Sequence, residues 1–84
     1  MYYVYILINL DRNKTYTGVT QDIQRRLKEH NQGKMAFSRK FAPYNILYME
    51  KFATSSEAYT KERFYKSTSG RRNIKNMLES PPSA

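Results

Sequence analysis

The sequence contains no cysteine and no tryptophan, only three glycines and a single histidine. Without cysteine the chain can form no disulfide and no thiolate metal site, and one histidine cannot build a zinc centre. The three glycines are not arranged as a glycine-rich phosphate-binding loop. There is no signal peptide, and no apolar run comes near the roughly 18 residues that a membrane-spanning helix needs. We therefore expect a cytoplasmic protein with no membrane partner.

Acidic residues are also few. Seven Asp and Glu residues stand against 15 Lys and Arg residues, which gives a formal net charge of +8 and a pI near 9.9. Such an excess favours polyanions, which are DNA, RNA or an anionic surface. Charge alone leaves one alternative open, a basic protein without any polyanionic partner.

The length and the C-terminal composition indicate one domain with a tail. A chain of 84 residues normally forms a single domain. The last residues, Ser80-Pro81-Pro82-Ser83-Ala84, cannot continue a helix because of the two prolines. We therefore expect a domain over residues 1–79 and a flexible tail over residues 80–84.

The first half of the chain predicts a hairpin followed by a helix. Tyr2–Leu10 is an unbroken run of β-formers, typical of a central strand that is covered on both faces. Thr15–Val19 alternates in the way of a second strand paired with the first. Thr20 is the expected N-cap of a helix over Gln21–Asn31, which Gly33 would end.

The second half predicts one strand and two helices. Tyr44–Phe52 has the β-branched and aromatic content of a third strand. Thr54–Glu57 has the spacing of a capping box and would begin a helix that ends near Ser67. A last short helix would begin at Ser69 or Gly70. The order β-β-α-β-α-α predicts a small α/β (α+β) domain, with a mostly antiparallel three-stranded sheet flanked by helices.

The hairpin brings two tyrosines to one face of the sheet. If Asp11–Lys14 is the loop, odd residues of the first strand share a face with even residues of the second. Tyr5 and Tyr16 then lie on the same face. Gly18 would lie opposite Leu7 and leave a gap between the tyrosines where a ligand backbone could approach. Ordinary cross-strand aromatic packing is the alternative reading.

The first helix adds a cation and an imidazole to that face. At ~100° per residue, Ile23, Leu27 and His30 fall within a narrow arc, and Arg26 lies about 60° to one side. Arg26 and His30 therefore flank the surface that packs on the sheet. Arginine suits bidentate phosphate recognition, and a neutral histidine can accept a proton near pH 7. The alternative is a structural histidine beside an arginine whose stem packs on the core edge.

The second helix carries a carboxylate on its inward face. Ala58, Glu62 and Tyr65 follow the spacing of an apolar stripe. An inward carboxylate needs a cation or a buried hydrogen bond to compensate it. Magnesium suits Glu62, because Mg²⁺ often takes one protein carboxylate together with waters and phosphate oxygens. A salt bridge to a neighbouring basic residue such as Lys66 is the alternative.

These residues are also where the sequence resembles the GIY-YIG nuclease superfamily. Tyr3–Tyr5 stands where the family has its first motif, and Tyr16–Gly18 stands at the second. The family's helical arginine and its His/Tyr position fall on Arg26 and His30, and its metal-binding glutamate falls on Glu62. The likeness covers nearly the whole chain. It is closest to the small stand-alone bacterial branch, which resembles the N-terminal domain of excision-repair nucleases.

The resemblance implies hydrolysis of a DNA phosphodiester bond. Glu62 would hold one Mg²⁺ (or Mn²⁺) against the cleaved phosphate, and Arg26 would neutralise charge on the phosphoryl oxygens. Tyr5 or Tyr16 would orient or deprotonate the attacking water, helped by His30. One site per chain favours nicking of single strands by a monomer.

Other positions depart from the family pattern or extend it. The first motif opens with Tyr3 instead of glycine, and the family's late asparagine has two candidates, Asn73 and Asn76. Basic residues outside the motifs are expected to contact the DNA backbone without reading sequence. They are Lys34, Arg39, Lys40, Arg71 and Arg72.

Two other functions remain open at this stage. A non-catalytic nucleic-acid-binding module with the same fold would bind in a salt-sensitive way and cleave nothing. A nuclease subunit that works only when a protein partner delivers DNA would also fit the sequence.

Overall fold

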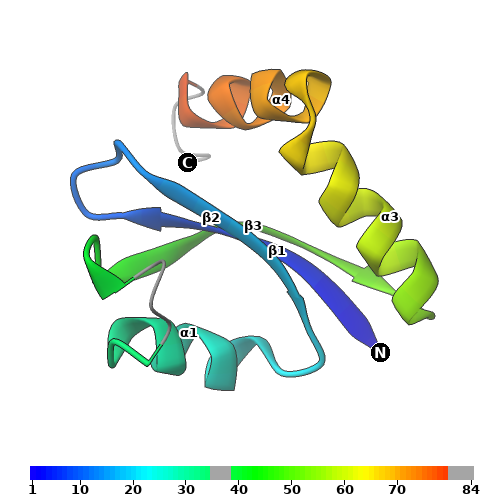
Figure 1. Cartoon of the computed structure of the whole chain (residues 1–84), viewed down its shortest axis with the longest axis horizontal. Helices are drawn as coiled ribbons and strands as arrows, with labels where there is room; N and C mark the ends of the chain where they lie inside the picture. Colours follow the sequence, from blue (N-terminus) through cyan, green and yellow to red (C-terminus); the bar gives the residue numbers. More distant parts are fainter. Residues whose placement is uncertain (35–38, 80–84) are drawn as a thin grey trace, which may run out of the picture.

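The computed structural model describes residues 1–34 and 39–79 and has a three-stranded sheet with helices on both of its faces (Figure 1). The element order is β-β-α-β-α-α, which confirms the predicted α+β fold class. Residues 80–84, predicted to form the tail, lie outside the described residues. None of the described helices is long and apolar enough to cross a membrane. The elements are β1 (Tyr2–Asn9), β2 (Thr15–Thr20), α1 (Ile23–Asn31), β3 (Tyr44–Phe52), α3 (Ser55–Lys66) and α4 (Thr68–Glu79).

The first strand forms the centre of the sheet. The strand order is β2-β1-β3, and β1 pairs antiparallel with both neighbours. Residues 4–9 of β1 are all buried, as expected for a strand covered on both faces. In Figure 1, α1 lies on one side of the sheet, and α3 and α4 lie on the other. The side chains of β1 therefore divide between two different surroundings.

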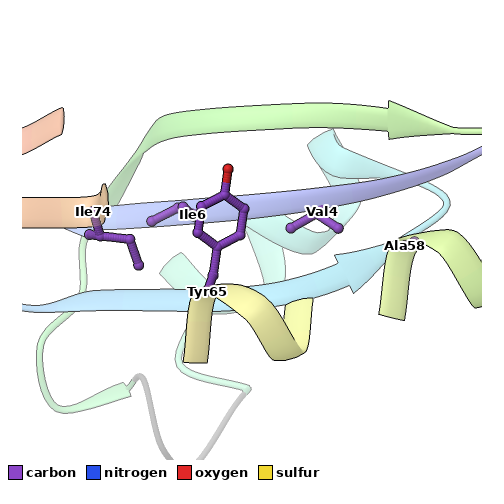
Figure 2. Close-up of a cluster of buried hydrophobic side chains, with 5 residues drawn as sticks. All are labelled: Val4, Ile6, Ala58, Tyr65 and Ile74. Carbon is purple, nitrogen blue, oxygen red and sulfur yellow. The ribbon is translucent and has the colours of Figure 1, made fainter. Parts of the chain in front are cut away.

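The even residues of β1 face α3 and α4. Val4 and Ile6 form a hydrophobic core with Ala58 and Tyr65 of α3 and Ile74 of α4 (Figure 2). Burial of an aliphatic or aromatic side chain of this size contributes about 1.5–3 kcal/mol, so this cluster is the main apolar support of a small domain. The predicted inward face of the second helix is confirmed at Ala58 and Tyr65.

The odd residues of β1 face α1. Tyr5 and Leu7 form a buried cluster with Tyr44 at the start of β3, against which Ile23 and Leu27 of α1 pack. We call Tyr5, Leu7 and Tyr44 the α1-side cluster. It contains two hydroxyl groups, whereas the opposite core is mostly aliphatic, so the two faces of one sheet differ in chemistry.

The predicted register of the hairpin is wrong by two residues. The backbone N–H of Asn9 donates to the carbonyl of Lys14 at 3.1 Å, so the turn is Leu10–Asn13 and not Asp11–Lys14. The side chain of the buried Asn9 determines this choice, since its Oδ1 accepts the backbone N–H groups of Asn13 and Lys14 at 3.1 and 3.0 Å. Hydrogen bonds from a side chain to the backbone of the following turn favour that turn over a turn at a neighbouring position.

The shift in register changes which residues of β1 and β2 pair, but each side chain stays on the predicted face of the sheet. Gly18 lies opposite Tyr5, and Tyr16 lies opposite Leu7. Because the shift is even, Tyr5 and Tyr16 still share one face. The prediction that Gly18 opposes Leu7 and leaves a gap for a ligand is wrong, since Gly18 faces the ring of Tyr5 itself.

The first helix begins later than predicted. Thr20 still pairs with Tyr3 at the end of β2, so its backbone is extended and it is not the N-cap. Asp22 takes that position, and its Oδ1 accepts the N–H of Arg25 at 3.1 Å. The predicted end is confirmed, because Gly33 has a φ of 77° in the left-handed region that favours glycine.

Candidate active site

Three predicted site residues from three elements meet on the α1 side of the sheet. Tyr5 comes from β1, Tyr16 from β2 and His30 from α1. The ring centroids of Tyr16 and His30 are 4.5 Å apart, and those of Tyr5 and Tyr16 are 6.3 Å apart. His30 and Tyr5 are fully buried, whereas Tyr16 is only half-buried. Of these three rings, Tyr16 is the one that solvent reaches.

The hydroxyl of Tyr5 joins α1 to the sheet. Its oxygen lies 3.1 Å from Nε2 of His30, and it also forms a hydrogen bond with the side chain of Arg26. A guanidinium group only donates, so the Tyr5 oxygen accepts from Arg26 and can give its own proton to His30. The sequence placed these residues on facing surfaces, and the structure joins them through hydrogen bonds.

Burial controls the protonation of this group. Desolvation raises the pKa of Tyr5 to about 12, although the hydrogen bond from Arg26 opposes the increase. Burial also lowers the pKa of His30, and the positive charge of Arg26 lowers it further. At neutral pH Tyr5 is therefore a protonated hydroxyl and His30 a neutral imidazole. Tyr5 is a poor general base in this state and a good hydrogen-bond donor.

Gly18 provides the space that the Tyr5 ring occupies. A Cβ atom built on Gly18 would lie 2.5 Å from the Tyr5 hydroxyl oxygen and 2.7 Å from its Cζ. Real Cβ atoms do not approach other atoms this closely. Glycine is thus needed at this position because the Tyr5 side chain crosses it. The absence of a side chain at Gly18 allows Tyr5 to reach α1.

Arg26 lies at the border between the buried group and solvent. Its side chain is 35% exposed, and Nη1 forms an ion pair with Oε1 of Glu29 at 3.3 Å. The neighbouring Arg25, 76% exposed, pairs with the other oxygen of Glu29 at 3.6 Å. Arg26 and Glu29 also line a polar hollow of about 320 Å³ between the end of β2 and α1. An anion can therefore reach the guanidinium of Arg26 from this side.

Glu62 lies on α3, the helix after β3. Its carboxylate is 18% exposed and pairs with Lys66 at 3.7 Å, which is the salt bridge that the sequence offered as an alternative. The negative charge of Glu62 is nevertheless among the causes that raise the pKa of Tyr5. Since α3 packs on β1 and β2, the Glu62 carboxylate is close enough to the Tyr5 hydroxyl to affect its pKa.

The only carboxylate of the predicted site is that of Glu62, and a single carboxylate is compatible with a magnesium site. Within residues 1–34 and 39–79 there is no group of three or more His, Cys, Asp or Glu side chains that could hold a metal ion. Mg²⁺ does not need such a group, because it commonly takes one carboxylate, with waters and substrate phosphates as its other ligands. A largely buried Glu62, whose described ion-pair partner is an exposed lysine, meets that requirement.

The five predicted backbone-contact residues are all exposed but do not lie together. Lys34, Arg39 and Lys40 belong to the segment between α1 and β3, whereas Arg71 and Arg72 belong to α4 on the opposite face of the sheet (Figure 1). A DNA strand that lies on the α1 side of the sheet would therefore reach the three basic residues between α1 and β3 before it reached the two arginines of α4.

Two residues beside His30 were missed in the sequence. Tyr44 is buried, its ring centroid lies 6.1 Å from that of His30, and burial raises its pKa. Asn31 holds it in place, because its Oδ1 accepts the N–H of Tyr44 at 2.6 Å and its Nδ2 donates to the Tyr44 carbonyl at 3.1 Å. The only sequence signal was that both residues stand at the ends of predicted elements.

Comparison with known proteins identifies the family. The model of the GIY-YIG catalytic domain matches residues 1–76. The chain therefore belongs to the GIY-YIG family of nucleases, and membership implies DNA as the substrate. The resemblance drawn from the motif residues is confirmed.

The relatives are small stand-alone proteins of the same family. A UPF0213 protein of Oceanobacillus iheyensis is 42% identical over 62 residues, which cover 73% of this chain and 71% of that protein. One from Bacillus licheniformis is 38% identical over 79 residues, or 93% and 79% of the two chains. The solution NMR structure of a UPF0213 protein from Bacillus halodurans matches with a TM-score of 0.54 at 32% identity, and the match covers 98% of this chain and 89% of that one.

Proposed function

We propose that the chain is a divalent-metal-dependent endonuclease that hydrolyses DNA phosphodiester bonds one strand at a time. The observation that carries the proposal is the hydrogen-bonded group of Arg26, Tyr5 and His30. It presents a part-exposed guanidinium that lines a polar hollow, and the half-buried ring of Tyr16 packs against its Tyr5 and His30. A cation that is already oriented costs little reorganisation when charge develops on a phosphate.

Arg26 would bind the phosphoryl oxygens of the cleaved bond. Glu29 and Tyr5 each take a hydrogen bond from its guanidinium, so its orientation is fixed before substrate arrives. Glu62 would hold Mg²⁺ or Mn²⁺, which when bound supplies a Lewis acid for the phosphate and the leaving oxygen.

The two tyrosines would have different roles. With a pKa of about 12, Tyr5 stays protonated at neutral pH and supports His30 and Arg26 through hydrogen bonds. Tyr16 is the tyrosine of this group that solvent reaches, so we assign the contact with the attacking water to it. His30 is neutral, and its ring centroid lies 4.5 Å from that of Tyr16, so it would assist by holding the Tyr16 ring in place while its Nε2 accepts from Tyr5.

Nicking of supercoiled plasmid with Mg²⁺ or Mn²⁺ tests the proposal. Wild type would be compared with Arg26→Ala, Glu62→Gln and the control Arg25→Ala. Arg25 also pairs with Glu29 but is far more exposed than Arg26. Loss of a charge-stabilising donor commonly costs about 10²–10³ in rate, so we expect a loss of that order in Arg26→Ala and near wild-type nicking in Arg25→Ala.

The outcomes separate the proposal from its alternatives. Metal-dependent nicking that is lost in both site variants supports the nuclease and the roles of Arg26 and Glu62. Salt-sensitive DNA binding without cleavage on plasmid and on branched duplex would instead favour a binding module or a partner-dependent subunit. Circular dichroism of each variant would show whether a loss of activity comes from a loss of fold.

A further inference from the structure

Two lysines from different loops lie over the same aromatic ring. Nζ of Lys14, at the end of the hairpin turn, is 5.2 Å from the ring centroid of Phe41. Nζ of Lys40, in the segment before β3, is 5.7 Å from the same centroid. Both distances are within the range of a cation–π interaction. We call Lys14, Phe41 and Lys40 the two-lysine cluster.

The two-lysine cluster concentrates positive charge. Since both Nζ atoms are near one centroid, they are at most about 11 Å apart, close to one Debye length at ordinary salt. Neither ammonium has an ion-pair partner among the residues that the structure describes. The ring compensates only part of the repulsion between two like charges. An anion bound between them would compensate more of it.

The two-lysine cluster adjoins the candidate active site. Lys14 precedes Tyr16 by two positions along the hairpin, and side chains two positions apart in a strand share a face. Their Cα atoms are therefore about 7 Å apart, twice the rise of one strand residue. Phe41 packs against the α1-side cluster, which contains Tyr5 and Tyr44. The two lysines thus belong to the same face of the molecule as Tyr16.

We propose that Lys14 and Lys40 together bind a backbone phosphate of the DNA strand that passes over Tyr16. Since the Cα atoms of Lys14 and Tyr16 are only about 7 Å apart, this phosphate and the bond to be cleaved belong to the same short stretch of one strand. The inference rests on the proposed function.

Salt dependence of DNA binding, measured without divalent metal, tests this inference. Fluorescence anisotropy of a labelled duplex would be followed over a range of NaCl concentrations with the full chain. Each phosphate contact contributes about 0.9 to the slope of log K against log salt. Because the two lysines share one phosphate, we expect Lys14→Gln/Lys40→Gln to lower that slope by about 1 and to weaken binding at low salt.

Two matched variants complete the test. Lys51→Gln/Lys75→Gln removes the same charge at two exposed lysines outside the expected DNA contacts and is expected to keep the wild-type slope. Lys14→Arg/Lys40→Arg keeps the charge, so we expect this variant also to have the wild-type slope. All four positions are exposed, so these substitutions leave the core intact.

An unchanged slope in Lys14→Gln/Lys40→Gln would overturn the inference. Equal losses in Lys14→Gln/Lys40→Gln and in Lys51→Gln/Lys75→Gln would overturn it too, because they would mean that only net charge matters. Absence of DNA binding by wild type would have the same consequence. Since binding is measured without metal, a protein that shows the expected slope change but never nicks plasmid would refute the nuclease and leave the phosphate contact standing.

Discussion

Replacement of Gly18 by alanine tests the central packing arrangement of the site. An added Cβ would lie 2.5 Å from the Tyr5 hydroxyl oxygen, and Tyr5 is only 1% exposed, so its ring has little room to move. Forcing it aside costs about 1–3 kcal/mol of strain. It would also break the 3.1 Å hydrogen bond to His30, and a buried group left without its partner costs about 1–3 kcal/mol more. We expect Gly18→Ala to lower the free energy of unfolding by about 2–6 kcal/mol.

Urea unfolding followed by circular dichroism measures this effect. The sign alone is informative, because alanine for glycine at an unstrained position stabilises a protein by about 0.4–1 kcal/mol. In a Tyr5→Phe background the closest contact and the hydrogen bond are both absent, so the cost of Gly18→Ala should shrink by at least about 1 kcal/mol. A neutral or stabilising Gly18→Ala, or costs that simply add in the double variant, would refute the packing described for Tyr5.

Other substitutions test the groups around this pair. Burial lowers the pKa of His30 in the folded state, so the unfolded chain binds this proton at higher pH and stability should fall as the pH drops below about 6.5. His30 is the single histidine, so a His30→Gln variant should lose this dependence between pH 7 and 5 in urea unfolding; its persistence would contradict the assignment. Asn31→Ala removes two hydrogen bonds to the Tyr44 backbone and should cost about 1–3 kcal/mol, whereas the exposed Gln32→Ala should cost little. Thr54→Ala removes the N-cap of α3 and should cost about 1 kcal/mol in the same assay, and an unchanged midpoint would show that Thr54 does not cap the helix.

Local signals predicted the elements well. Tyr44–Phe52 is a strand with the predicted bounds, and the capping box begins α3, since Thr54 accepts the N–H of Glu57 at 3.3 Å. Both features depend on residues close in sequence. The proximity of Tyr5, Tyr16 and His30 was also predictable, because the periods of strand and helix determine which faces meet.

The errors occurred where several local solutions compete. The turn contains Asp11 and Asn13 and follows Asn9, and each of these side chains could cap a turn. Burial of Asn9 decides the register, and burial depends on how the whole sheet packs. The two hydrogen bonds between Asn31 and the Tyr44 backbone join the end of α1 to the start of β3. The hydrophobic periodicity within a helix or a strand gives no information about such a contact. The approach of Glu62 to Tyr5 depends in the same way on how α3 packs.

The alternation along β1 gives the two faces of one strand different neighbours. Val4 and Ile6 support α3 and α4, while Tyr5 and its partners form the candidate site behind the same backbone. Because Val4 and Ile6 adjoin Tyr5 in the chain and pack on the helix that carries Glu62, substitutions there couple to the site instead of adding to its changes independently. Evolution or an engineer that changes thermal tolerance on one side of this strand therefore changes the catalytic side as well.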